Sequence, residues 1–225
     1  MAESGSKRID RRDLKGPDEF VVTVGRLMSW GRRHQRTLTL GVGAVAVLVA
    51  VVTLLGWNSA RRTQQAAERF RQAYSAFQNE DYGVAAAEFE SLATGYARTS
   101  FGKLAALYRG HSLRADGDAD AAAISYRIFV DSGAGSDDLR QAALFALGQL
   151  REDTASTGEA IDLYRQAAAL DGPYQQEASL GAARLMTAVG RDGEARALYT
   201  TLLESADGEL KALVEAKLAA LPAAS

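Results

Sequence analysis

Side chains that could carry out chemistry are few in this 225-residue chain. It has no cysteine, which excludes a thiol nucleophile, a disulfide framework and a thiolate-ligated zinc or iron–sulfur site. Its two histidines are His34 and His111, and His111 has no second histidine or cysteine with which to share a metal ion. We expect His111 to be half-buried or to line a groove. We predict no metal site and no cofactor.

Other segments match catalytic motifs only in part. The segment GVGAVA at residues 41–46 fits a relaxed dinucleotide fingerprint, but it lies in an apolar stretch without a strand–turn–helix around it. Leu104 follows Lys103 where a phosphate loop needs Ser or Thr. The paired acids Glu152 and Asp153 fall at a predicted helix end, where carboxylates are favoured or merely solvated. We therefore predict that the protein is not an enzyme.

A long apolar segment divides the chain. Residues 37–57, TLTLGVGAVAVLVAVVTLLGW, are almost wholly apolar, and no charged residue occurs from Thr37 to Ala60. A transmembrane helix needs about 20 such residues, whereas a helix in a soluble core keeps a polar stripe. A cleavable signal peptide is another alternative, but its apolar region is shorter, about 7–15 residues. We predict an uncleaved transmembrane helix over 37–57.

Indoles and arginines flank this segment on both sides, as is typical of membrane interfaces. The predicted membrane-interface residues are Trp30, Arg32, Arg33, Arg36, Trp57, Arg61 and Arg62. The cations nearest the segment are almost evenly divided, but residues 1–36 hold 9 Lys+Arg against 5 Asp+Glu, and the remainder holds 17 against 23. By the positive-inside rule a short basic tail stays on the cytoplasmic side of the membrane, so we predict a cytoplasmic N-terminus. In a bacterium the C-terminal domain would then lie in the periplasm, as part of a single-pass inner-membrane protein.

The basic tail over 1–36 has two predicted parts. Residues 1–16 show no apolar periodicity, so we expect disorder there. Phe20, Val24, Leu27 and Met28 share one helical face, which favours a short helix on the membrane surface. A basic cluster beside a membrane typically contacts anionic lipid, so we predict membrane contact and no nucleic-acid partner.

Four similar repeats follow the apolar segment. In each, a small residue is followed twelve positions later by alanine and four positions after that by an aromatic residue, and equivalent positions are 37, 38 and 35 residues apart. The small residues are Ala73, Gly110, Gly148 and Ala183, the alanines are Ala85, Ala122, Ala160 and Ala195, and the aromatics are Phe89, Tyr126, Tyr164 and Tyr199. Antiparallel helices approach closely where one presents at most a methyl group, and the aromatic fills the groove beside that contact. The spacing predicts four helix–turn–helix units.

Polar breaks separate the predicted helices. Gly117 suits the left-handed conformation that ends a helix, and Asp118 suits the cap of the next one. Ser156 and Glu159 have the spacing of a capping box. A last helix over 209–221 mixes apolar and charged residues, as expected of a cap that covers the final repeat.

This pattern resembles the tetratricopeptide repeat, a helix–turn–helix unit of 34 residues, over about residues 66–205. The resemblance implies an all-α fold. A single N-terminal transmembrane helix precedes a repeat domain over 58–225, which is a right-handed solenoid of about four repeats with a capping helix at its C-terminal end. First helices of such repeats line a concave surface. The inward positions implied for protein binding are Phe70, Tyr74, Phe77, Leu107, His111, Arg114, Phe145, Gln149 and Arg184. Phe70 and Phe145 could equally be core between repeats. Arg114 and Arg184 could hold carboxylates or backbone carbonyls of a client.

The order of a basic tail, one anchor and a repeat domain resembles the bacterial ancillary SecYEG translocon subunit family. That resemblance implies a membrane-tethered scaffold whose partners are translocon subunits, periplasmic chaperones or secretory clients. The alternative is a structural scaffold in envelope assembly or cell division. The sequence leaves the oligomeric state open.

Overall fold

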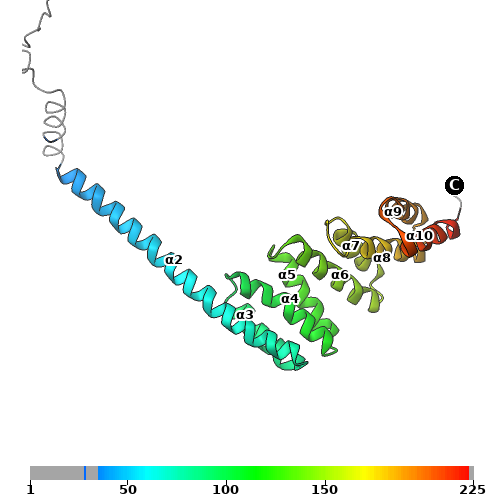
Figure 1. Ribbon diagram of the computed structural model, residues 1–225, viewed down its shortest axis with the longest axis horizontal. Coiled ribbons are helices and arrows are strands. Elements are labelled where there is room, and N and C mark those ends of the chain that lie inside the picture. The colour runs from blue at the N-terminus through cyan, green and yellow to red at the C-terminus, as the bar shows by residue number, and fades with distance from the viewer. Residues whose placement is uncertain (1–27, 29–34, 223–225) are drawn as a thin grey trace, which may run out of the picture. The chain divides into compact units, whose positions relative to one another are not determined.

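The computed structural model describes Met28 and residues 35–222, and all regular secondary structure in this part of the chain is helical (Figure 1). Two units meet between Asn58 and Ser59, which is a position within the first long helix. The helices in order are α2 (Gln35–Gln78), α3 (Tyr82–Gly95), α4 (Ser100–Ala115), α5 (Ala119–Asp131), α6 (Asp137–Asp153), α7 (Thr157–Ala168), α8 (Gln175–Ala188), α9 (Asp192–Ser205) and α10 (Gly208–Ala220).

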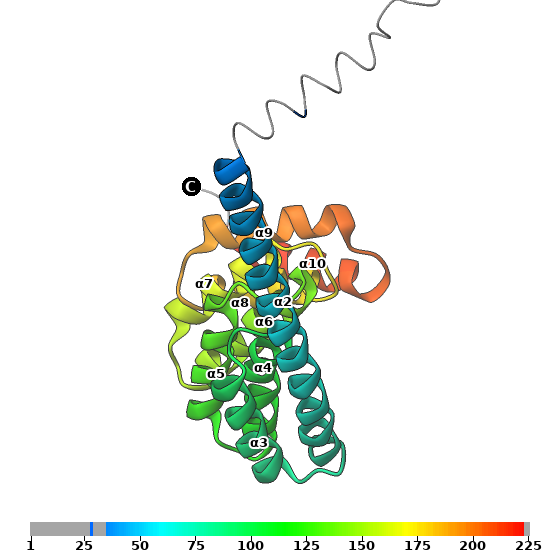
Figure 2. The ribbon, with the colours of Figure 1, turned by 90° about the vertical axis from the view of Figure 1, so that its left-hand side faces the viewer.

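Helix pairs stack in sequence order in the second unit, residues 59–225. The C-terminal part of α2 packs with α3, and α4 with α5, α6 with α7 and α8 with α9 follow as pairs. The capping helix α10 packs on α9 (Figure 2). Helices in the described part contact chiefly their neighbours in sequence, which is the arrangement of a solenoid. The predicted all-α solenoid of four helix pairs and a capping helix is confirmed.

Small residues and aromatic rings meet inside each pair. All twelve repeat-packing residues named above are buried. A Cβ atom placed on Gly110 would lie 2.7 Å from the ring of Tyr126, and one placed on Gly148 would lie 2.8 Å from the ring of Tyr164. These approaches are shorter than van der Waals contact, so glycine allows the two helices of each pair to come together around the ring.

The predicted boundary between α4 and α5 has the expected structure. Gly117 has φ +91°, in the left-handed region that glycine adopts without strain. The Asp118 carboxylate caps α5 by accepting a hydrogen bond from the backbone N–H of Ala121 at 3.0 Å. This bond satisfies one of the donors that the start of a helix leaves free.

The predicted capping box at the start of α7 was wrong. Ser156 is the N-cap residue, but its side chain makes no cap hydrogen bond. The Glu159 carboxylate pairs instead with Arg127 on α5 and with Arg151 on α6, the latter at 2.9 Å. Glu159 therefore links three helices and does not reach back to its own helix start.

A buried amide joins the third and fourth pairs. Gln141, on α6, is fully buried. Its Nε2 donates to the carbonyl oxygens of Ala167 (3.1 Å) and Leu170 (2.7 Å), and its Oε1 accepts from the N–H of Tyr174 (3.0 Å). The amide therefore bonds to the last turn of α7 and to the residue before α8.

The first unit contains the apolar part of α2. Within the described residues, one helix is long and apolar enough to span a membrane, and none of its apolar window is buried. Its large apolar side chains, such as Leu40 and Val49, are exposed by 76 % and 57 %. Helix α2 also holds Arg36, Trp57, Arg61 and Arg62. The predicted interface residues Trp30, Arg32 and Arg33 and most of the predicted tail helix lie outside the described residues.

Candidate functional site

The nine residues predicted to bind protein lie on the first helices of the four pairs. Phe70, Tyr74 and Phe77 are on α2, whereas Leu107, His111 and Arg114 are on α4, Phe145 and Gln149 are on α6, and Arg184 is on α8. The structure places eight of them in two groups, an aromatic cluster around α2 and α4 and a polar pocket lined from α4, α6 and α8, whereas Leu107 belongs to neither.

Tyr108 is the centre of the aromatic cluster. Its ring centroid lies 5.2 Å from that of Phe70, 5.4 Å from Tyr74, 6.3 Å from Phe77 and 5.6 Å from Phe89. Because these rings come from α2, α3 and α4, they form packing between the first two pairs. Burial raises the pKa of the Tyr108 hydroxyl, and nearby Tyr74 adds to the rise. Phe70 is therefore largely core between repeats, the alternative that the sequence left open.

Leu107 does not lie on an accessible face. It is 1 % exposed and belongs to the core, so its predicted place among the binding residues was wrong. Tyr108, the next residue, is the half-buried one. Successive residues on a helix point about 100° apart, so an error of one position exchanges a core side chain for a surface one.

His111 is half-buried between two tyrosine rings. Its Nδ1 is hydrogen bonded to the Tyr126 hydroxyl at 2.9 Å, and its ring centroid lies 5.8 Å from that of Tyr108. Burial and, to a smaller extent, the neighbouring Arg114 guanidinium lower the pKa of His111 to about 4. Burial raises the pKa of Tyr126 to about 12, although Arg114 opposes this rise. At neutral pH this link between α4 and α5 is uncharged.

Four of the predicted residues line one pocket, here called the notch. Arg114, Phe145, Gln149 and Arg184 converge there from α4, α6 and α8. The notch has a volume of about 380 Å³. Its other lining residues are Glu152, Asp153, Tyr164, Glu177, Leu180 and Gly181. Three successive first helices thus contribute to one accessible hollow.

A hydrogen-bonded network holds one wall of the notch. Arg184 Nη2 donates to the two carboxylate oxygens of Glu152 at 2.6 and 2.7 Å, and the Tyr164 hydroxyl donates to Oε2 of Glu152 at 3.1 Å. The Tyr164 ring lies between two glycines, because a Cβ atom on Gly181 would approach it to 3.1 Å and one on Gly148 to 2.8 Å. Burial and the Glu152 carboxylate raise the pKa of Tyr164. The hydroxyl therefore stays protonated as a donor.

Sequence reasoning missed Glu152. We expected this acid to be solvated or to interact with a helix end, but it is the acceptor of the network. A signal was present, since Glu152 follows Gly148 by four residues as Arg114 follows Gly110. The repeat register therefore predicts a place on the concave surface for Glu152 as strongly as for Arg114.

Phe145 has contacts of both kinds. Its ring centroid lies 5.1 Å from Tyr174 and 5.5 Å from Tyr164, so it packs between the third and fourth pairs. It also lines the notch and is only partly buried. Phe145 can therefore offer an apolar surface to a ligand without leaving its packing position.

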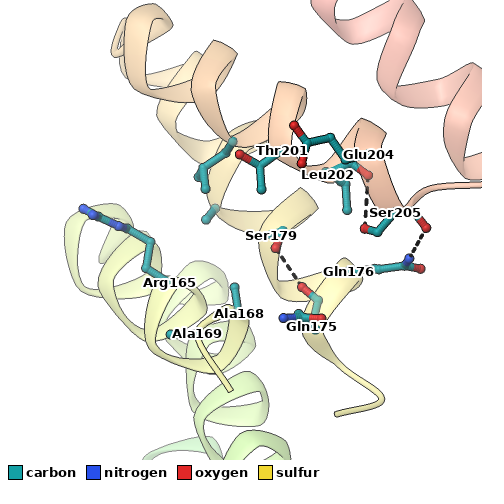
Figure 3. A pocket seen from close by; sticks show the side chains of 12 residues that line it. Arg165, Ala168, Ala169, Gln175, Gln176, Ser179, Thr201, Leu202, Glu204 and Ser205 are labelled. Carbon is teal, nitrogen blue, oxygen red and sulfur yellow. Dashed lines mark hydrogen bonds between the residues drawn. The ribbon is translucent and has the colours of Figure 1, made fainter. Parts of the chain in front are cut away.

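A second pocket of about 480 Å³ lies among α7, α8 and α9, and none of the nine predicted residues lines it (Figure 3). Two of its polar side chains bond within the protein. Gln176 Nε2 donates to the Ser205 carbonyl oxygen at 3.0 Å, and the Ser179 hydroxyl donates to the Gln175 carbonyl oxygen at 2.8 Å (Figure 3). The notch gathers four of the nine predicted residues, so it is the better candidate for recognition.

Comparisons with known proteins agree with this architecture. A family model described as a tetratricopeptide repeat-like domain matches residues 29–223. Two crystal structures of nearly identical TPR-like repeats from a Podosopora anserina kinesin light chain, the second of them a point variant, each align with a TM-score of 0.52 and 17 % identity. They cover 70 % of this chain and 85 % and 84 % of their own. At that identity the likeness shows the fold alone.

No curated protein matches the chain. The family model, in contrast, spans most of it, including every helix pair and the capping helix. The chain belongs to the tetratricopeptide repeat-like domain family.

Proposed function

We propose that this protein is a membrane-tethered scaffold that binds a protein partner at the notch. The notch carries the proposal, because it brings residues from three first helices together on one accessible face. Tetratricopeptide repeat-like domains are protein–protein interaction scaffolds, and first helices present the concave surface of such a solenoid. Phe145 supplies apolar area and Gln149, Glu152 and Arg184 supply polar groups, which is the mixture that protein interfaces use.

The exposed apolar part of α2 supports the tether. A soluble protein rarely exposes contiguous apolar surface of more than a few hundred Å². The large apolar side chains that the structure describes between Leu40 and Trp57 are exposed by 46–76 %, and no charged residue interrupts the segment. In a bilayer the same side chains would be covered by lipid. We propose that α2 anchors the chain in a bacterial inner membrane, with the N-terminus cytoplasmic and the repeats periplasmic.

Tethering gives the scaffold a mechanism without added contacts. Confinement of the notch beside the membrane raises its effective concentration towards partners at the same surface. We propose that the partners are translocon subunits, periplasmic chaperones or secretory chains, which follows from the architectural resemblance described above. A structural scaffold in envelope assembly or cell division is the competing assignment.

In vivo photocrosslinking tests the proposal. A photoreactive residue would replace Gln149 in the notch, and the matched control would carry it at Glu88, an exposed position on α3. We expect the captured proteins, identified by mass spectrometry, to be translocon subunits, chaperones or secretory chains, and only from Gln149. Capture of one fixed envelope or division complex would favour the competing assignment, and equal capture from Glu88 would contradict the notch as the binding face.

A further inference from the structure

Five charged side chains line the notch, and two of them neutralise each other. Arg184 is paired with both carboxylate oxygens of Glu152. Among the described residues no ion pair involves Asp153 or Glu177, the two other acids that line the notch. Arg114 is the remaining cation. The unpaired groups are thus two carboxylates against one guanidinium.

Arg114 is held towards α5 by its surroundings. Its guanidinium acts on His111 and on the hydroxyl of Tyr126, which lie where α4 packs against α5. Asp153 and Glu177 belong to α6 and α8 and form no ion pair among the described residues. Because Arg184 is paired with Glu152 and Arg114 interacts with Tyr126, the carboxylates of Asp153 and Glu177 are available to a ligand.

Apolar atoms line the same notch beside these acids. Phe145 and Leu180 are partly buried and contribute to its surface. Lysine and arginine side chains have an apolar stem and a charged head, and they bury the stem along apolar surface while the head meets an acceptor. An aromatic ring beside the stem adds a cation–π attraction when the cation lies over its face.

The net charge of the whole repeat domain also favours a positively charged partner. Residues 59–225 hold 17 Lys+Arg against 23 Asp+Glu. An excess of negative charge attracts cationic segments at long range and raises their rate of encounter. The local charge of the notch and the field of the domain therefore agree.

We propose that the notch binds a lysine or arginine side chain of an extended segment in the partner, with the cation at Asp153 or Glu177 and the stem on Phe145 and Leu180. This rests on the proposed function, whose partner it specifies by chemistry. It also revises the expectation that Arg184 holds a carboxylate of the partner, because Arg184 is already paired with the carboxylate of Glu152.

Labelling of synthetic peptides tests this recognition on the full chain in lipid nanodiscs. The probes are three short Gly/Ser peptides that differ only in a central Lys, Gln or Glu. Each is irradiated with the chain that carries the photoreactive residue at position 149, and the yield is compared with that from position 88. We expect the Lys peptide to be labelled about three- to tenfold more than the Glu peptide, with the Gln peptide between them, and the ratio to fall in high salt.

Two charge-matched double variants make the test specific. D153N with E177Q removes the acids of the notch, and we expect the Lys-to-Glu ratio to fall to about one. D131N with E215Q removes two exposed acids elsewhere, so the net charge changes equally and the ratio should stay high. All four positions are exposed, so the fold should be retained. A ratio unchanged by the notch variant, or preference for the Glu peptide, would overturn the proposal.

The remaining outcomes distinguish a failure of cation recognition from a failure of the proposed scaffold function. If position 149 captures a partner in cells but labels no peptide above position 88, cation recognition is wrong and the scaffold function stands. If position 149 captures nothing in cells either, the proposed function itself fails. A crosslink between two copies of the chain at position 149 would assign the notch to self-association and would also overturn the proposal.

Discussion

Gln141 is a buried polar side chain whose partners are all backbone groups. It accepts one hydrogen bond and donates two, to groups at both ends of the connection between α7 and α8. Gln141→Leu keeps a similar volume but leaves two carbonyl oxygens and one N–H without this partner. We expect the free energy of unfolding to fall by about 2–4 kcal/mol, measured by denaturant unfolding followed by circular dichroism.

Gln149→Leu is the matched control for this variant. Gln149 is on the same helix, but it is only partly buried and lines the notch. We expect a change within about 0.5 kcal/mol, since no backbone group depends on its amide. Equal losses in the two variants would show that the amide of Gln141 has no special part in stability.

His111 predicts a pH dependence of stability. Its folded pKa is lowered to about 4 from 6.5, mainly by burial, so the folded state prefers the neutral ring. When the pH falls below 6.5, the unfolded chain takes up the proton first, and stability is lost between pH 6.5 and 4. We expect a loss of about 1–2 kcal/mol between about pH 7.5 and 5, after allowance for partial exposure to solvent.

Replacement of His111 by glutamine isolates this effect. Glutamine can still bond to the Tyr126 hydroxyl but does not titrate. Denaturant unfolding of His111→Gln at the two pH values should therefore show a smaller drop than the wild type. A drop of the same size would assign the pH dependence to other groups, and most carboxylates titrate below this range.

Residue types predicted packing better than they predicted polar partners. The glycine, alanine and aromatic positions followed from volume, and the structure buries all twelve of them. Leu107 was misplaced because Tyr108, one residue later, is the surface side of that helix. Gln141 could not be found, since its partners lie 26–33 residues away and its own repeat position gives no sign of them.

At the scale of helices, two caps with similar sequence signals differ in structure. Asp118 accepts a hydrogen bond from the N–H of Ala121, whereas Ser156 makes no side-chain bond at the start of α7. Asp118→Ala should therefore lower the free energy of unfolding by about 1 kcal/mol, and Ser156→Ala by less than about 0.5 kcal/mol. Thermal and denaturant unfolding of the two variants would measure this, and a larger loss from Ser156→Ala would contradict the assignment.

Helix boundaries were predictable to within a few residues because glycine and aspartate act locally. Gly117 and Asp118 need only their own neighbours in the chain to end α4 and begin α5. The capping box failed because Glu159 has stronger partners, the guanidinium groups of Arg127 and Arg151 on two other helices. The end of α2 was also not predicted, since the helix continues from the apolar segment to Gln78.

At the scale of the whole molecule, the apolar part of α2 is the proposed membrane anchor. Val47 and Val51 are exposed and lie one turn apart near its middle. Arginine at both positions should disfavour insertion by about 5–7 kcal/mol, since one central arginine costs about 2.5–3.5 kcal/mol. We expect the double variant to leave the membrane fraction on alkaline extraction and ultracentrifugation.

Ser59→Arg with Thr63→Arg is the matched control, with the same added charge and spacing beyond the apolar segment. This variant should remain in the membrane fraction. Release of the wild type under the same extraction would contradict the tether, and so would retention of the variant with arginines at 47 and 51.

Orientation is the remaining property of the whole chain, and the absence of cysteine makes it measurable by single-site labelling. Ala197, exposed on α9, and Ser6, in the basic tail, would each be replaced by cysteine in separate variants. In cells with a permeabilised outer membrane, a membrane-impermeant maleimide should label position 197 at once and position 6 only after the inner membrane is broken. This expectation follows from the positive-inside rule, because a short basic segment, here with 9 Lys+Arg against 5 Asp+Glu, tends to stay in the cytoplasm, whereas a long domain crosses largely regardless of its charge. Labelling of position 6 alone would reverse the orientation and place the notch in the cytoplasm, where periplasmic partners could not reach it.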